Sequence, residues 1–218
     1  MTSTRAPSQS CVERVVADGM CIGCGACAAM VEPGAITMEL AANGFIEPRV
    51  HDREAVASIE DDFDRVCPGR TVIGPATRES LIWGPVASIA AGHAIDAETR
   101  HVASSGGALT ALCGHLLDSG RVDVVVAMAN DADDPLHPRP RLARSRAELV
   151  DTAGSRYCPS SPVAALSEVE PDERVAFVGK PCDVAAVRQM MKLDASLRGR
   201  VTYLLSFFCA GIPSFAGT

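Results

Sequence analysis

Three cysteines recur at every third position in the segment Cys21-Ile22-Gly23-Cys24-Gly25-Ala26-Cys27, and Cys67-Pro68 follows forty positions later. Three thiolates at this spacing can bind one face of a cubane 4Fe–4S cluster, and a distant Cys-Pro is a usual source of the fourth ligand. Gly23 and Gly25 let the backbone curl tightly, so that amide N–H groups can point at the cluster sulfurs. The pattern predicts a 4Fe–4S site with Cys21, Cys24, Cys27 and Cys67 as ligands.

Two other interpretations of these cysteines stay open. A zinc site is less well matched, because zinc sites usually combine one C-x2-C pair with a second pair. The thiols could also be unligated. A 4Fe–4S cluster transfers single electrons, so redox chemistry is the leading hypothesis.

The composition describes an ordinary globular protein of 218 residues, with 47% hydrophobic and 22% charged residues. The net charge of −7 and the lack of a basic stripe argue against nucleic-acid binding. The polar first ten residues do not have the pattern of a signal peptide, and no apolar run reaches the length of a transmembrane helix. The chain has nine cysteines, which is an odd number, and the spacing among them is that of cluster ligands. Both features favour a reduced cytoplasmic environment over a disulfide scaffold.

The elements that must position the cysteines divide the chain into three parts. Residues 1–10 are expected to be a flexible terminus, residues 11–80 a small ferredoxin-like iron–sulfur module, and residues 81–218 an α/β domain. In the module we expect strands near Ala35–Leu40 and Gly44–Pro48, and a helix from about Arg53 to Arg65 with Cys67 just past its end. A connector is expected at 75–85.

The second half alternates apolar runs with amphipathic segments, which is typical of α/β layering. Strands are expected at Val86–Ala91, Val122–Ala129, Arg174–Val178 and Val201–Phe208, with an Asp- and Pro-rich loop up to about Pro140. A helix is expected over Gly107–Ser119, capped by Ser104 or Ser105, because its apolar residues have helical spacing: Leu109, Leu112, Cys113, Leu116 and Leu117. A second helix should begin at Pro181. This order predicts a largely parallel sheet with flanking helices.

The last expected strand leads into a turn at Cys209–Ser214 and the sequence stops at Thr218. Such a turn usually leads into a helix, so we expect a truncated chain. A natural, exposed terminus is the alternative.

Three turns between strands and helices carry polar residues suited to a ligand. Ser104-Ser105-Gly106-Gly107-Ala108-Leu109-Thr110 could bind a nucleotide pyrophosphate through N–H groups and hydroxyls, or could be an ordinary helix cap. In Gly179-Lys180-Pro181-Cys182, Lys180 could pair with a phosphate or a reduced flavin, or be an exposed lysine. In Ser155-Arg156-Tyr157, Tyr157 could stack on a planar ring or serve plain packing. Cys158, Cys182 and Cys209, at the ends of expected strands, could bind a second metal site or fill small gaps.

Taken together, the chain resembles the coenzyme F420 hydrogenase/dehydrogenase beta-subunit family. The matching pieces are CIGCGAC with the distal CPG, SSGGALTALCGHLL, GSRYCPSSP, FVGKPCDVAAVR and LSFFCAGIPS. The resemblance implies a flavoprotein that carries FAD and a 4Fe–4S cluster. It also implies FAD contacts at Ser104, Ser105, Gly106, Gly107, Thr110, Ser155, Tyr157, Gly179, Lys180, Pro181 and Cys182. Where a two-cluster ferredoxin loop has Cys-Pro, this chain has Glu32-Pro33, so the module is expected to hold one cluster.

The expected function is that of an oxidoreductase that relays electrons between ferredoxin or a partner subunit, the cluster, FAD and a two-electron small-molecule acceptor such as coenzyme F420. No side chain is singled out as catalytic, because a flavin carries the hydride itself. Two alternatives remain: an electron-transfer or docking subunit with a cluster and no flavin, and a zinc-stapled binding module.

Overall fold

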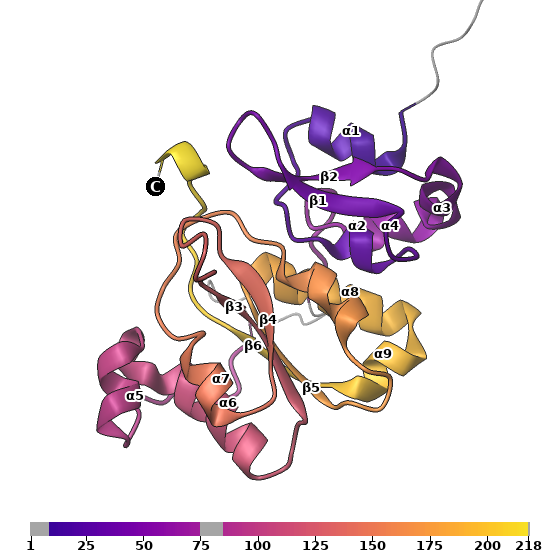
Figure 1. Ribbon diagram of the computed structural model, residues 1–218. Helices are drawn as coiled ribbons and strands as arrows, with labels where there is room; N and C mark the ends of the chain where they lie inside the picture. The colour runs from indigo at the N-terminus through magenta and orange to yellow at the C-terminus, as the bar shows by residue number, and fades with distance from the viewer. Residues whose placement is uncertain (1–8, 75–84, 218) are drawn as a thin grey trace, which may run out of the picture.

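The computed structural model describes residues 9–74 and 85–217 (Figure 1). The N-terminal cysteine-rich unit contains α1 (Cys11–Ala17), α2 (Ala26–Ala29), β1 (Ile36–Leu40), β2 (Ile46–Val50), α3 (Arg53–Ser58) and α4 (Glu60–Val66). The α/β unit that follows contains α5 (Ala97–Val102), η1 (Ser105–Gly107), α6 (Ala108–Asp118), β3 (Val124–Ala129), β4 (Arg139–Ala143), α7 (Arg146–Val150), η2 (Pro162–Glu168), β5 (Val175–Gly179), α8 (Pro181–Leu193), α9 (Ala195–Arg200), β6 (Val201–Ser206) and η3 (Phe215–Gly217).

The cysteine-rich unit is built on the expected hairpin, in which β1 and β2 pair antiparallel from Ile36 opposite Val50 to Leu40 opposite Ile46. Ser10 belongs to this unit, because its hydroxyl accepts from the N–H of Glu13 and so caps α1. The connector expected at 75–85 and the boundary expected at residue 80 lie almost wholly outside the described residues, as do residues 1–8 of the expected terminus.

The helix expected over 53–65 is two helices instead of one. Asp52 caps α3 through the N–H groups of Glu54 and Ala55, and the backbone leaves the helical region at Ile59, with φ −105° and ψ 1°. The break keeps Ile59 buried in the same small core as Val56 on α3 and Phe63 on α4. Cys67 directly follows α4, as expected.

The α/β unit has a four-stranded sheet in the order β4-β3-β5-β6. Strand β3 pairs parallel with β5, and β5 pairs parallel with β6. Helices α8 and α9 and segment η2 contribute to the apolar core on one face of the sheet, and α6 and α7 contribute to the core on the other (Figure 1). The expected fold class, a largely parallel sheet with flanking helices, is confirmed.

Two expectations about strands were wrong. Val86–Ala91 forms no strand; Val86 is 48% and Ile89 is 89% exposed, because this apolar run lies beside no other strand of the described residues. Strand β4 was not expected: it begins at Arg139, where the expected loop ends, and pairs antiparallel with β3. Pro140 hid it, because proline cannot donate to a ladder, yet an edge strand such as β4 tolerates it.

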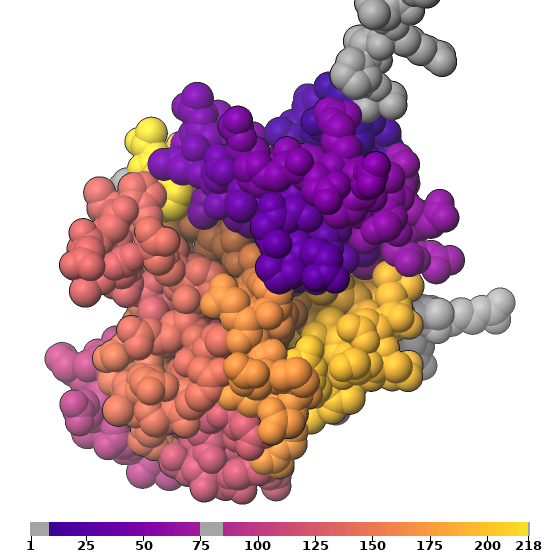
Figure 2. Space-filling view, turned by 45° about the vertical axis from the view of Figure 1, so that its right-hand side comes forward, coloured from indigo at the N-terminus to yellow at the C-terminus, as the bar shows by residue number. Residues whose placement is uncertain are grey.

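The two units share an apolar core, so the N-terminal unit packs directly against the α/β unit (Figure 2). The shared core combines three residues of the first unit with residues from η2, β5 and α8: Cys24, Ala26, Val66, Val163, Phe177 and Val187. The cysteine loop is therefore positioned by the fold of the second unit as well as by its own.

Candidate functional site

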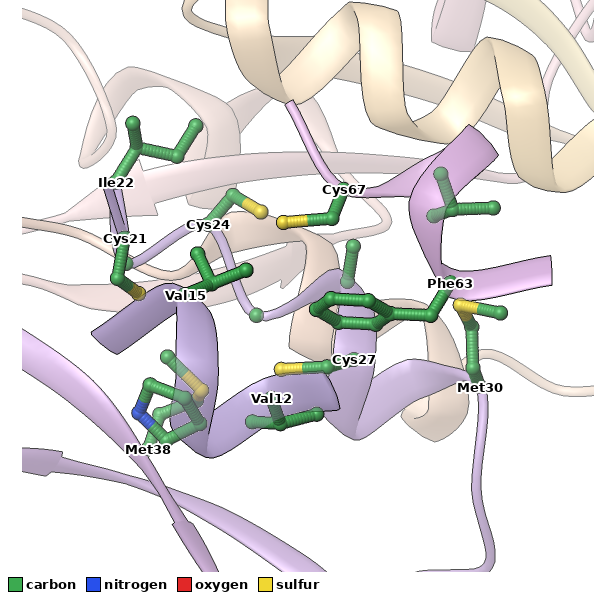
Figure 3. Close-up of a pocket in the computed structure, with 15 residues that line it drawn as sticks. Val12, Val15, Cys21, Ile22, Cys24, Cys27, Met30, Met38, Phe63 and Cys67 are labelled. Atoms are coloured by element: carbon green, nitrogen blue, oxygen red, sulfur yellow. The ribbon is translucent and has the colours of Figure 1, made fainter. Parts of the chain in front are cut away.

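The four cysteines of the sequence pattern gather around one cavity in the N-terminal unit. Cys21, Cys24 and Cys27 reach it from the loop and from α2, and Cys67 reaches it from the end of α4, with Val12, Val15 and Phe63 completing the wall. In Figure 3, Cys24 and Cys67 extend toward each other and Cys27 lies below them on α2. The spacing therefore predicted correctly which cysteines come together.

The cavity surrounds these thiols with apolar side chains, so they are neutral as long as nothing positive lies among them. Burial raises the pKa of Cys27 to about 12 and raises the pKa of Cys24 well above its usual value. Burial also raises the pKa of Cys21 and Cys67. A metal group that takes these sulfurs as thiolates must displace their protons and supply the missing positive charge.

Backbone N–H groups lie beside the sulfurs, as the glycines in the loop suggested. The amides of Gly23 and Ala26 lower the pKa of Cys21 and Cys24 against the larger effect of burial, and the amide of Gly69 does so for Cys67. Such donors stabilise a thiolate and any anionic sulfur bound there.

The four thiols line one cavity, but their arrangement is not that of a metal site. Among residues 9–74 and 85–217, no three His, Cys, Asp or Glu side chains are close enough together to hold a single metal ion. A tetrahedral zinc site needs every sulfur about 2.3 Å from one ion. Four thiols are a donor set that both iron–sulfur clusters and zinc accept, and it is the C-x2-C-x2-C spacing with a distant Cys-Pro that favours a cluster.

A second, larger cavity of about 590 Å³ lies at the carboxyl ends of the parallel strands. Met128 of β3, Gly179 of β5 and Ser206 of β6 contribute to its wall. Its volume falls in the range of about 300–1,000 Å³ that small-molecule sites occupy, and this edge of a parallel sheet is where such ligands bind.

Seven of the residues expected to contact FAD line this cavity: Ser104, Ser105, Thr110, Ser155, Tyr157, Gly179 and Lys180. The other four, Gly106, Gly107, Pro181 and Cys182, are not part of its wall. Of the three cysteines considered for a second metal site, Cys158 and Cys209 line it and Cys182 does not.

The turn before α6 differs from the expected serine cap. Neither Ser104 nor Ser105 caps the helix; the capping position is Gly107, with φ 70° and no side-chain hydrogen bond. A Cβ at Gly107 would lie 2.9 Å from the carbonyl oxygen of Thr99, so only glycine fits there. Ser104 instead accepts a hydrogen bond of 2.8 Å from the hydroxyl of Ser155, which joins two of the expected contact loops.

Lys180 is neither an exposed lysine nor a free phosphate ligand. It is 5% exposed, and its Nζ lies 2.8 Å from Asp183 Oδ2 and 2.8 Å from Ser160 Oγ. Asp183 also accepts from the backbone N–H of Lys180, whereas its Oδ1 is buried with no protein partner. Burial raises the pKa of Asp183, and the Lys180 ammonium opposes that rise. The ammonium thus belongs to a buried ion pair in the cavity wall.

Sequence reasoning assigned no ligand contact to several residues of the wall, above all Arg156, Ser160 and Asp183. The half-buried guanidinium of Arg156 donates to Asn130 Oδ1 and to the carbonyl of Thr152, each at 2.8 Å, and burial lowers its pKa. Its place between Ser155 and Tyr157 was the signal available in the sequence. A cation fixed at this point suits an anionic ligand.

The fold and the two cavities define an α/β protein with a large cavity at the carboxyl edge of its sheet and a cysteine-rich unit packed on it. Residues 89–167 match the profile of the family described as coenzyme F420 hydrogenase/dehydrogenase, beta subunit N-term, and residues 172–218 match that of its C terminus. The chain belongs to this family of oxidoreductase components. Both matched segments begin after the cysteine-rich unit.

Several relatives bear F420-linked names. The chain is 36% identical over 113 residues to the F420-dependent formate dehydrogenase subunit beta of Methanocaldococcus jannaschii, covering 51% of this chain and 29% of that one. It is 28% identical over 137 residues to the coenzyme F420 hydrogenase subunit beta of Methanosarcina barkeri, covering 60% and 47%.

Among solved structures, the F420-reducing [NiFe] hydrogenase complex from Methanosarcina barkeri matches with a TM-score of 0.50 and 28% identity, covering 54% of this chain and 42% of that one. This chain spans less than half the length of these relatives. No helix among its described residues has the length and apolar character needed to cross a bilayer.

Proposed function

We propose that this protein is an iron–sulfur flavoprotein that relays electrons between ferredoxin or a partner subunit and a two-electron acceptor such as coenzyme F420. The observation that carries the proposal is the gathering of four thiols from two distant segments around one cavity. That cavity lies in a unit packed against the α/β unit whose larger cavity would take FAD.

For the cysteine cavity we propose a 4Fe–4S cluster held by Cys21, Cys24, Cys27 and Cys67. A bound cluster would supply one-electron transfer. The amides of Gly23, Ala26 and Gly69 would stabilise its sulfurs, and Val12, Val15 and Phe63 would keep water away from it. The run of three cysteines at every third position, with Cys67-Pro68 further on, favours this group over zinc, whose sites usually combine two C-x2-C pairs.

For the larger cavity we propose FAD, which would carry the two-electron chemistry. The hydroxyls of Ser104, Ser105 and Thr110 lie on its wall beside the N-terminus of α6, where a pyrophosphate would meet both donors and the positive end of the helix dipole. Arg156 and Tyr157 line another part of the wall and suit an anionic group and a planar ring.

The two proposed sites are close enough to share an electrostatic environment. Asp183 lines the larger cavity, and its carboxylate adds to the rise that burial causes in the pKa of Cys24. The side chains of this chain would therefore act by holding the two groups near each other. Its nine cysteines, all of them free thiols, suit a reducing cytoplasmic environment.

The acceptor is the part of the proposal that the names of the relatives support. Both sequence relatives and the structural neighbour are named for coenzyme F420. A partner subunit is proposed on the same ground, because the names describe subunits and a complex.

Anaerobic reconstitution tests the proposal. We expect about four irons per chain, a broad visible absorbance, and FAD released on denaturation. Bound zinc without colour would indicate the zinc-stapled module instead. A chain that binds iron but takes up no flavin, even when excess FAD is supplied, would indicate an electron-transfer or docking subunit.

A further inference from the structure

Two adjacent serines connect the cysteine loop to the wall of the larger cavity. The Ser161 hydroxyl donates to the carbonyl oxygen of Gly23 at 2.6 Å, in the middle of the cysteine pattern. The Ser160 hydroxyl accepts from Lys180 Nζ at 2.8 Å, in the cavity wall. Both serines are buried, Ser160 with 8% and Ser161 with 7% of its surface exposed, so water cannot easily replace either bond.

On the side of the cysteine loop, the contact is tight over several residues. The N–H of Val163 donates to the carbonyl of Cys24 at 3.1 Å. A Cβ at Gly25 would lie 2.8 Å from the Cβ of Ala164. Close packing of this kind transmits a displacement, because neither surface has room to absorb it.

On the side of the cavity, Ser160 and Pro162 are themselves part of the wall. The Lys180 ammonium is held between Ser160 and Asp183, and the Ser160 carbonyl lies 3.4 Å from the same nitrogen. A shift of residue 160 therefore moves the acceptor that fixes this cation.

We infer that Ser160 and Ser161 couple the two sites, so that loading the cysteine loop with its cluster increases the affinity of the larger cavity for its ligand. The inference rests on the proposed function and names how its two sites depend on each other. Affinity should increase because loading pre-organises the cavity wall. Once the four cysteines are held by a metal group, Gly23 and Cys24 fix residues 161 and 163. Residue 160 and Lys180 are then already in place when the ligand arrives.

The coupling is measured as the ratio of two dissociation constants for FAD, one of the iron-loaded chain and one of the iron-free chain. We expect iron-loaded wild-type protein to bind FAD about fivefold more tightly or better, the lower end of usual coupling between sites. By reciprocity, bound FAD should raise the equilibrium affinity of the cysteine loop for its metal group by the same factor.

Alanine variants locate the coupling. Ser161→Ala and Ser160→Ala should each bring the ratio toward one, and the double variant should lower it no further, because both serines act along one connection. Ser167→Ala is the matched control: Ser167 lies on segment η2, which begins directly after Ser161, is exposed, and donates to the carbonyl of Ala164. It should keep the wild-type ratio.

The outcomes separate the inference from the proposed function. Wild-type protein that binds both iron and FAD with a ratio of one overturns the inference and leaves the proposed function standing. A wild-type chain that takes up no iron, or no FAD, overturns the proposed function itself. The ratio measured for the wild-type protein shows whether the two sites are coupled even if a serine variant fails to fold. A Ser167→Ala variant that loses the coupling as fully as Ser161→Ala also overturns the inference.

Discussion

The cysteine-rich unit and the α/β unit are stabilised in different ways. In the α/β unit, Val124, Val125 and Val126 of β3 are fully buried between helices, so apolar packing holds the fold. The N-terminal unit has helices of four to seven residues around a small core, with four thiols at its centre. This difference predicts that the first unit depends on the proposed cluster and on the surface it packs on, whereas the second has a core of its own.

The strongest test of this contrast is Cys67→Ser. We expect iron content to fall to near background and the visible colour to be lost, because a serine hydroxyl is a poor substitute for a thiolate ligand. Iron analysis and absorbance after anaerobic reconstitution measure this. Cys113→Ser is the control, because Cys113 is buried in the other unit on α6 and should leave iron uptake intact. Undiminished iron in Cys67→Ser would contradict the ligand assignment.

A second test removes one partner of the ion pair that borders both regions. Asp183→Ala leaves the buried ammonium of Lys180 without its anion, and such a change costs about 3–5 kcal/mol. Asp64→Ala, which breaks an exposed pair with Arg70, is the control and should unfold close to wild type. Denaturant unfolding of the two variants measures the loss of stability in each. Equal losses in the two variants would show that burial of the Lys180–Asp183 pair does not matter.

A third test concerns the contact between the regions. Gly25 and Gly19 both have positive φ, 84° and 68°, so alanine at either costs about 1–2 kcal/mol in the backbone. Only at Gly25 would the new Cβ also press against Ala164; at Gly19 nothing lies within 4 Å. Gly25→Ala should therefore lose more of the free energy of unfolding than Gly19→Ala. A larger loss at Gly19 would contradict the close packing.

The smallest expected effect is a pH dependence within the α/β unit. Arg174 donates to both carboxylate oxygens of Asp123 and lowers its pKa from 3.8 to about 2. The ionised form is favoured in the folded state, so the contribution to stability is complete above pH 3.8 and is lost as the pH falls toward 2. It should stay below about 1 kcal/mol, because the pair is partly exposed. Asp123→Asn should remove this contribution; an unchanged profile of stability against pH would refute it.

Local patterns in the sequence predicted much of the molecule. The C-x2-C-x2-C spacing and the distant Cys-Pro identified the four cysteines that share a cavity. Apolar runs located β3, β5 and β6 within a few residues, and Pro181 marked the start of α8.

The features that sequence reasoning missed depend on contacts between distant segments. Strand β4 exists because it pairs with β3, despite Pro140 at its second position. Asp183 looked like an ordinary first-turn residue of a helix, and only its burial beside Lys180 makes it part of the cavity wall. Val86–Ala91 had the composition of a strand, but composition cannot supply a neighbour to pair with.

The bond between Ser161 and Gly23 spans 138 positions of the chain. A contact between such distant segments forms late in folding, because a long loop must close first. During synthesis the four cysteines emerge well before Val163, which packs with Cys24 in the shared core. Until that segment is available the cysteine loop lacks the surface it packs on, so its thiols depend on a reducing environment.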